Sequence, residues 1–329
     1  MRGNRPFADL EQHVLSALES SAPGGVAVAC SGGPDSVALL AAAAAVARAA
    51  GRDVAALHVN HGVRPAADRD EGVAMAAATH AGAPFHSVLL EPGGPADEAG
   101  LRALRYEALT AMARAAGCGT VATAHTLEDQ VETVLLAVVR GTGLRGLSGM
   151  PGRRPLGANV ELIRPVLERR RGELRAYCHA RALPYAIDES NEEPRYRRNR
   201  LRRLLAELRA VEPSADEAIS RLARLAREED DWLDRQAAEA LASSLIEGAR
   251  LSGGIRTLAR PLVRRVLRLW LGGRDLAYEP LDRLADAVME GRRGRYFVRK
   301  GEEVVIREGA LERRAHGDGS SGQSEADGI

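Results

Sequence analysis

Short apolar runs alternate with longer amphipathic stretches over the first two thirds of the chain, which predicts a parallel sheet covered by helices. The runs are rich in valine and alanine, which is typical of strands buried on both faces. The predicted strands are residues 26–30, 53–59, 85–90, 120–124 and 160–163. The predicted helices are residues 7–20, 36–50, 68–82, 98–116, 127–140, 168–183 and 200–210.

The pattern changes after Pro213-Ser214. Three helical patterns follow with no strand between them, at residues 216–246, 257–271 and 281–290. Two apolar runs, 296–298 and 304–306, predict a hairpin. From about Ala315 onward, glycine, serine and aspartate are typical of a disordered tail.

These patterns predict an α/β fold with a doubly wound, Rossmann-like parallel sheet and a smaller, mainly α-helical C-terminal domain. The expected divisions are residues 1–212 for the sheet domain, 213–312 for the helical domain and 313–329 for the tail. Residues 141–157 are rich in glycine and proline, and a loop of that length is usually functional or mobile.

A glycine-rich turn, Ser31-Gly32-Gly33-Pro34-Asp35-Ser36, joins the first predicted strand to an alanine-rich helix. It lies at the end of the sheet where open α/β folds bind ligands. Gly32 and Gly33 allow close approach to a phosphate, and the helix start offers unpaired N–H groups. Asp35 would repel phosphate unless a divalent cation lay between them. The turn therefore predicts a phosphate and metal site, although a plain helix-capping turn uses the same residue types.

A second polar stretch, from His125 to Glu132, follows the fourth predicted strand. Asp129 and Glu132 are three residues apart and so share one side of the predicted helix. The helix dipole alone can explain acidic residues in a first turn, but it does not explain the preceding histidine. A row of carboxylates beside a phosphate loop suits Mg²⁺ or a cationic substrate such as an amine.

The net charge of +1 conceals a basic middle segment. Residues 151–210 hold 15 basic and 8 acidic residues, a net charge of +7. Six arginines between Arg195 and Arg203 form the densest part, which favours a polyanionic partner over a solvated helix face.

Three isolated cysteines without a C-x-x-C pair argue against a disulfide framework or a metal knot. No apolar run approaches the ~18 residues of a membrane span, and the N-terminus lacks a hydrophobic signal core. We therefore expect a cytoplasmic protein without a membrane association.

The glycine-rich turn resembles the SGGxDS loop of the N-type ATP pyrophosphatases, or PP-loop superfamily, whose fold is adenine nucleotide α hydrolase-like. Further motifs follow in the order of one family. They are His58 to Arg64, Leu104-Arg105-Tyr106, His125 to Glu132, Arg140 to Gly143, Gly146 to Met150, Arg164-Pro165, Asp188 to Asn191 and Arg198-Asn199-Arg200. Together they resemble tRNA(Ile)-lysidine synthetase over residues 24–210. Thr126 and Glu128 depart from the family pattern, so neither is assigned a role.

The resemblance implies that O2 of a wobble cytidine attacks the α-phosphate of ATP, and that the ε-amine of free L-lysine then displaces AMP. The implied RNA is the isoleucine tRNA with a CAU anticodon, and the implied cofactors are ATP and Mg²⁺. The implied catalytic residues are Asp35, Arg105, His125, Asp129 and Glu132. The implied ATP-binding residues are Ser31, Gly32, Gly33, Pro34, Asp35, Ser36, His58, Asn60 and His61.

Asp35 is also the implied magnesium ligand, and Asp129 and Glu132 would hold the lysine ammonium. The expected tRNA contacts are Arg195, Arg198, Asn199, Arg200, Arg202 and Arg203.

Three other functions stay open. They are a tRNA-thiolating enzyme of the same fold, an amidating synthetase acting on a small molecule, and a nucleotide-binding regulatory module. Thiolating enzymes generally need paired cysteines, the basic segment favours RNA, and binding alone would not need the row of carboxylates. The oligomeric state stays open between a monomer and a homodimer.

Overall fold

The computed structural model of this chain describes residues 7–60, 67–90, 98–157, 159–186, 197–246, 250–273 and 276–315, with the backbone alone at 67, 68, 98, 99 and 197–199. The chain divides into two compact units, residues 1–226 and 227–329. Each unit has its own hydrophobic core.

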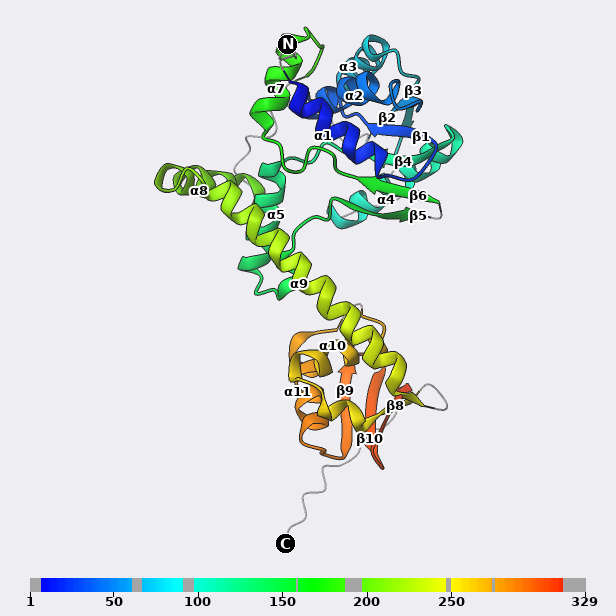
Figure 1. The fold of residues 1–329 in the computed structure, drawn as a ribbon, viewed down its shortest axis with the longest axis vertical. Helices are drawn as coiled ribbons and strands as arrows, with labels where there is room; N and C mark the ends of the chain where they lie inside the picture. The colour runs from blue at the N-terminus through cyan, green and yellow to red at the C-terminus, as the bar shows by residue number, and fades with distance from the viewer. Residues whose placement is uncertain are drawn as a thin grey trace. The chain divides into compact units, whose positions relative to one another are not determined.

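The first unit is built on a six-stranded sheet with the order β3-β2-β1-β4-β6-β5 (Figure 1). Its strands are β1 (Gly25–Ala29), β2 (Val54–Asn60), β3 (Phe85–Leu89), β4 (Cys118–Ala122), β5 (Arg153–Gly157) and β6 (Val160–Ile163). All neighbours run parallel except β5, which pairs antiparallel with β6 at the edge. The predicted parallel sheet is confirmed.

Helices cover both faces of this sheet. Val26 and Val28 of β1 share a core with helices α1, α2, α3 and α7, whereas Ala27 packs with α4 on the opposite face, as strand alternation requires. The helices of the first unit are α1 (Ala8–Glu19), α2 (Pro34–Ala47), α3 (Ala67–Ala81), α4 (Glu98–Ala115), α5 (Leu127–Val139), α6 (Leu144–Leu147), α7 (Arg171–Ala180) and α8 (Arg197–Val211), and α9 (Ala215–Ser244) starts in the first unit and ends in the second. The doubly wound arrangement is confirmed.

Residues 141–157, expected to be a loop, contain the short helix α6 and the strand β5. The Gln130 side chain holds this stretch to α5: its Oε1 accepts from Met150 N at 2.7 Å, and its Nε2 donates to Met150 O at 3.2 Å. Gly149 has φ +58°, and a Cβ there would lie 2.6 Å from Gln130 Oε1, so only glycine fits. The stretch is therefore anchored at one backbone position.

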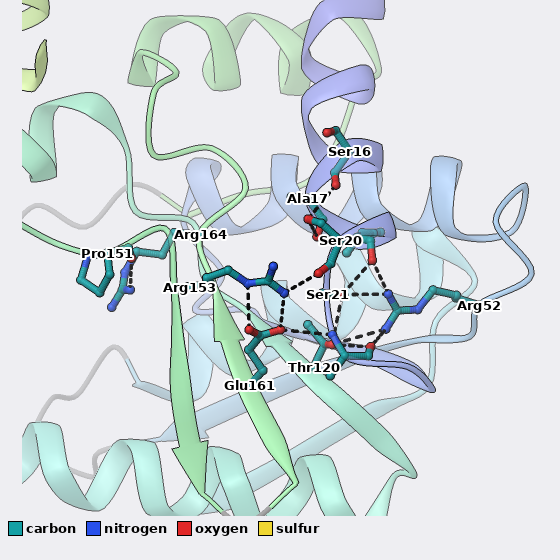
Figure 2. Close-up of polar contacts among 12 residues, drawn as sticks. Ser16, Ala17, Ser20, Ser21, Arg52, Thr120, Pro151, Arg153, Glu161 and Arg164 are labelled. Atoms are coloured by element: carbon teal, nitrogen blue, oxygen red, sulfur yellow. Dashed lines mark hydrogen bonds and ion pairs between the residues drawn. The ribbon is translucent and has the colours of Figure 1, made fainter. Parts of the chain in front are cut away.

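Two arginines hold the segment that leads from α1 into β1 against the sheet (Figure 2). Arg52 donates to the carbonyls of Leu18, Ala22 and Gly24 and to the hydroxyls of Ser21 and Thr120. Arg153 pairs with Glu161 at 2.8 Å and also donates to Ser20 O. We refer to the contacts of Arg52 as the Arg52 clasp.

The second unit contains a five-stranded sheet with the order β7-β8-β11-β10-β9. Its strands are β7 (Leu245–Ile246), β8 (Arg250–Ser252), β9 (Gly294–Arg299), β10 (Glu302–Arg307) and β11 (Ala310–Ala315). The end of α9, the 3₁₀ helix η3 (Gly253–Thr257), α10 (Arg260–Trp270) and α11 (Tyr278–Met289) complete it. Among the described residues of the whole chain, no helix is both long and apolar enough to cross a membrane.

The predicted hairpin is confirmed as β9 and β10, but two expectations for this unit are wrong. Strands β7 and β8 lie between the helices, where none was expected, because strands of two and three residues carry no readable period. Residues 313–315 belong to β11 and not to a tail, because they pair with residues 302–304 of β10. Residues 316–329 lie outside the described residues.

Candidate functional site

The order of the first sheet reverses between β1 and β4, since β2 and β3 lie on one side and β6 and β5 on the other. Ligands of open α/β sheets bind at such a switch point, beyond the carboxyl ends of the strands. The Ser31–Ser36 turn follows β1, and His125 leads from β4 into α5 (Figure 1). The two predicted motifs therefore start from adjacent strands at one edge.

The turn after β1 is shaped to approach an anion closely. Gly32 has φ +85°, and a Cβ there would lie 2.6 Å from the Asp70 carbonyl oxygen, so no side chain fits. The Ser36 hydroxyl accepts from Ser31 N at 3.1 Å and donates to Gly33 O at 2.9 Å. Helix α2 starts directly after Gly33, so its first N–H groups face the turn without intrahelical partners.

Asp35 lies in the first turn of α2, and its Oδ1 is buried without a hydrogen-bond partner. Burial raises the pKa of this carboxyl to about 6, against the opposing charge of Arg171, whose Nε is 3.6 Å from Oδ2. An orphaned carboxylate oxygen beside a turn predicted to bind phosphate fits a magnesium ligand. Among the described residues, no group of three or more acidic, histidine or cysteine side chains is placed to hold a metal ion.

Asp129 and Glu132 project from α5 toward this carboxylate. Asp129 caps its own helix, because Oδ2 accepts from Thr126 N at 2.9 Å and from the Thr126 hydroxyl at 3.0 Å. Burial alone would raise the pKa of Asp129, but Arg171 and Thr126 outweigh it and hold the pKa below its usual value. Glu132 is only 3% exposed. Thr126, to which no role was assigned, therefore has a structural one.

Arg171, the first residue of α7, gathers the acidic side chains. Its guanidinium pairs with Asp129 and lies 3.6 Å from Asp35 and 4.0 Å from Glu132. Its backbone N–H donates to both carboxylate oxygens of Glu128, at 3.1 and 3.2 Å. Glu128 therefore positions Arg171 from α5.

The sequence interpretation missed Arg171. It is the last of three consecutive arginines, and the other two pair elsewhere, Arg169 with Glu173 and Arg170 with Asp216. The available signal was the start of the following helix, but the pattern placed that start at residue 168. A shift of three residues changes which arginine faces the carboxylates.

His125 lies between the acidic side chains and a group of arginines. Its Nδ1 is 2.9 Å from the Thr123 hydroxyl. Burial, and then the positive charge of Arg164, lower the pKa of His125 to about 3. The ring is therefore neutral near pH 7, and it suits hydrogen bonding to an uncharged group better than accepting a proton.

Arg105, on α4, stands over the ring of Tyr106 with its guanidinium carbon 5.4 Å from the ring centroid. Its Nε is buried without a hydrogen-bond partner. His58 and Asn60 end β2 beside the turn, but both side chains are engaged: His58 Nδ1 is 2.9 Å from Cys30 O, and Asn60 donates to Glu71 at 3.2 Å. Their proposed contacts with ATP stay a prediction.

The predicted tRNA contacts are only partly described. Arg195 lies outside the described residues, as does His61 of the ATP-binding set, and Arg198 and Asn199 are described as backbone of α8 alone. Arg200 and Arg203 are exposed. Arg202 instead pairs with Glu132, with Nε 2.7 Å from Oε1.

A family model described as the PP-loop domain matches residues 7–208. The chain is 42% identical to a tRNA(Ile)-lysidine synthase of Salinispora tropica, over 84% of this chain and 84% of the relative. It is 40% identical to one of Salinispora arenicola, over 93% of this chain and 96% of the relative. The U34-tRNA thiolase NcsA of Methanococcus maripaludis is similar in structure, with a TM-score of 0.57 and 17% identity over 67% of this chain and 80% of that chain, a likeness of fold alone.

Proposed function

Since this chain belongs to the tRNA(Ile)-lysidine synthase family of PP-loop proteins, we propose that it ligates free L-lysine to C2 of the wobble cytidine in the isoleucine tRNA with a CAU anticodon. The reaction consumes ATP and releases AMP and diphosphate. It takes place in the cytoplasm, where tRNA, lysine and ATP meet. It changes the codon that the tRNA reads from AUG to AUA.

One observation carries the proposal: the glycine-rich turn after β1 and the carboxylates of α5, of which Glu132 is buried, meet at the switch point of one sheet. Asp35 of the turn and Asp129 of α5 both lie against the guanidinium of Arg171. The reaction needs both halves, because one must hold ATP and the other an amine. A nucleotide-binding module would need only the first.

In the first step, cytidine O2 attacks the α-phosphate and diphosphate leaves. The N–H groups at the start of α2 and the Ser31–Ser36 turn would stabilise the negative charge that develops on the phosphates. Mg²⁺ held by Asp35 would neutralise the charge of the leaving diphosphate. Arg105 would contact the phosphate or the activated base, since its Nε lacks a partner.

In the second step, the lysine ε-amine forms a bond to C2, and the bond from C2 to the AMP oxygen breaks. Asp129 and Glu132 would bind the lysine ammonium before it loses its proton. Both carboxylates already pair with arginines, Asp129 with Arg171 and Glu132 with Arg202. Lysine must therefore displace or share a cation that the protein itself supplies.

His125 supports recognition of the base in this scheme. A neutral imidazole can donate or accept a hydrogen bond without adding charge beside the cytidine. Its low pKa makes it a weak proton acceptor, so deprotonation of the amine falls to a group other than His125.

The cysteines argue against thiolation. Cys30, Cys118 and Cys178 are free and buried. Burial raises the pKa of Cys178 to about 12, and its thiol donates to Pro34 O at 3.3 Å. A thiol held protonated in this way is a poor carrier of sulfur, because the thiolate is the reactive form.

The test is incorporation of labelled lysine. The protein is incubated with ATP, Mg²⁺, labelled lysine and unmodified isoleucine tRNA bearing CAU. Label in the RNA, dependent on ATP, is expected, together with one diphosphate released per lysine. Absence of label with authenticated tRNA and an active control enzyme would refute the proposal, and ATP-dependent amidation of a small molecule would support the rival synthetase.

A further inference from the structure

Tyr106 of α4 is surrounded by guanidinium groups. The guanidinium carbons of Arg154, Arg102 and Arg105 lie 4.7, 5.1 and 5.4 Å from its ring centroid. Arg102 also donates to the Tyr106 hydroxyl at 3.1 Å. The guanidinium groups cover the ring, so Tyr106 holds the arginine side chains apart and offers no free face for base stacking.

Arg164 supplies a fourth guanidinium from the end of β6, and it is only 5% exposed. Its Nη1 donates to Pro151 O at 2.6 Å, but its Nε is buried without a hydrogen-bond partner (Figure 2). A buried guanidinium N–H without a partner costs free energy unless an acceptor reaches it. The same is true of Arg105 Nε.

Among the described residues, no carboxylate lies within ion-pair distance of Arg105, Arg154 or Arg164. Burial raises the pKa of Tyr106, yet Arg102, Arg105 and Arg164 together lower it below its usual value. Convergent guanidinium groups, two of which have an Nε without a partner, favour an oxyanion with several acceptor oxygens.

We infer that Arg102, Arg154 and Arg164, spaced by Tyr106 and adjoining Arg105, bind a phosphodiester group of the RNA backbone next to the reacting cytidine. The inference rests on the proposed function, because it assigns that function's RNA a binding site outside the arginine segment of α8. We refer to the three arginines as the Tyr106 arginine cluster.

The location favours RNA over the diphosphate product, which offers the same phosphate oxygens. Helix α4 covers the face of the sheet opposite to α2, which begins in the ATP-binding turn, so the cluster and the turn approach the switch point from opposite faces. Arg102 is exposed on α4, and Arg154 lies on the edge strand β5. A site open at a sheet edge accepts a chain that continues on both sides.

The neighbouring residue on β5 provides a matched control. Arg153 points to the other face of the strand, where it pairs with Glu161 at 2.8 Å and donates to Ser20 O (Figure 2). Arg153→Gln and Arg154→Gln therefore remove the same charge from adjacent positions of one strand. Only the second removes it from the Tyr106 arginine cluster.

The experiment measures the dissociation constant of the isoleucine tRNA as a function of KCl concentration, without ATP or lysine. Arg154→Gln should weaken binding and reduce the slope of log K against log salt by about 1, the signature of one lost phosphate contact. Arg102→Gln, on an exposed helix surface, should do the same, whereas Arg153→Gln should match the wild type. Circular dichroism confirms that each variant is folded.

Equal slopes for the wild type and Arg154→Gln would overturn the inference, and so would an equal loss in Arg153→Gln. A second arm measures how strongly inorganic diphosphate inhibits lysidine formation. Weaker inhibition of Arg154→Gln, with an unchanged salt slope for RNA binding, would assign the site to the diphosphate product and would also overturn the inference. RNA binding needs no turnover. A wild type that forms no lysidine but shows the expected slopes would refute the proposed function and leave the RNA site standing.

Discussion

Arg202 holds Glu132 through both carboxylate oxygens, with Nε 2.7 Å from Oε1 and Nη2 3.4 Å from Oε2. If Glu132 binds lysine as proposed, the lysine ammonium must compete with Arg202 for this carboxylate. Removing the competitor in Arg202→Ala should lower the KM for lysine several-fold in steady-state assays at saturating tRNA. Leu204→Ala, which changes a side chain 60% exposed on the same helix, should leave that KM unchanged. An unaltered or raised KM in Arg202→Ala would contradict the competition.

Glu132→Gln tests directly whether this carboxylate binds the amine, as proposed. The amide keeps the shape but loses the charge, and a charged hydrogen bond contributes about 1.5–3 kcal/mol. The KM for lysine should therefore rise by roughly 10- to 150-fold, while ATP-dependent diphosphate release on tRNA changes much less. Glu128→Gln is the matched control, because an amide oxygen can still accept from Arg171 N. Equal losses in lysine and ATP use would contradict the assignment of Glu132.

The charged side chain of Asp35 destabilises the folded protein when no ligand is bound. Its raised pKa, about 6, means that folding disfavours the ionised form at neutral pH. Asp35→Asn should therefore raise the free energy of unfolding at pH 7 by about 1–3 kcal/mol while abolishing diphosphate release. In the wild type, stability from this group increases as the pH falls from about 6 to 3.8, and the variant should lack that increase. Urea unfolding without nucleotide measures it, and a less stable variant would contradict the prediction.

His125 should stay neutral through the physiological range. Its pKa, about 3 when folded, lies below the 6.5 of an unfolded histidine. The unfolded state therefore takes up this proton first, so the stability that His125 contributes is present above pH 6.5 and declines as the pH falls toward 3. NMR of the ring protons, assigned with His125→Gln, should show no titration between pH 5 and 8. A midpoint near 6.5 would contradict the burial argument.

Local sequence predicted the parts of the site that local chemistry determines. Gly32 and the acidic first turn of α5 could be recognised because a close backbone approach needs glycine and a helix start favours carboxylates. The pairing of Arg171 and Arg202 with those carboxylates could not, since α7 and α8 reach the site through tertiary packing. The edge strand β5 was missed for a related reason: its residues have no apolar alternation and become a strand only by pairing with β6.

The Arg52 clasp is a position at which a substitution is expected to give a temperature-sensitive allele. Its five hydrogen bonds fasten the start of the sheet, at the edge opposite to the Ser31–Ser36 turn and to Asp129. A substitution such as Arg52→Ala would therefore weaken the protein without altering the groups that meet its substrates. Under the proposed function, cells carrying that allele would grow normally at low temperature and lose AUA decoding at high temperature.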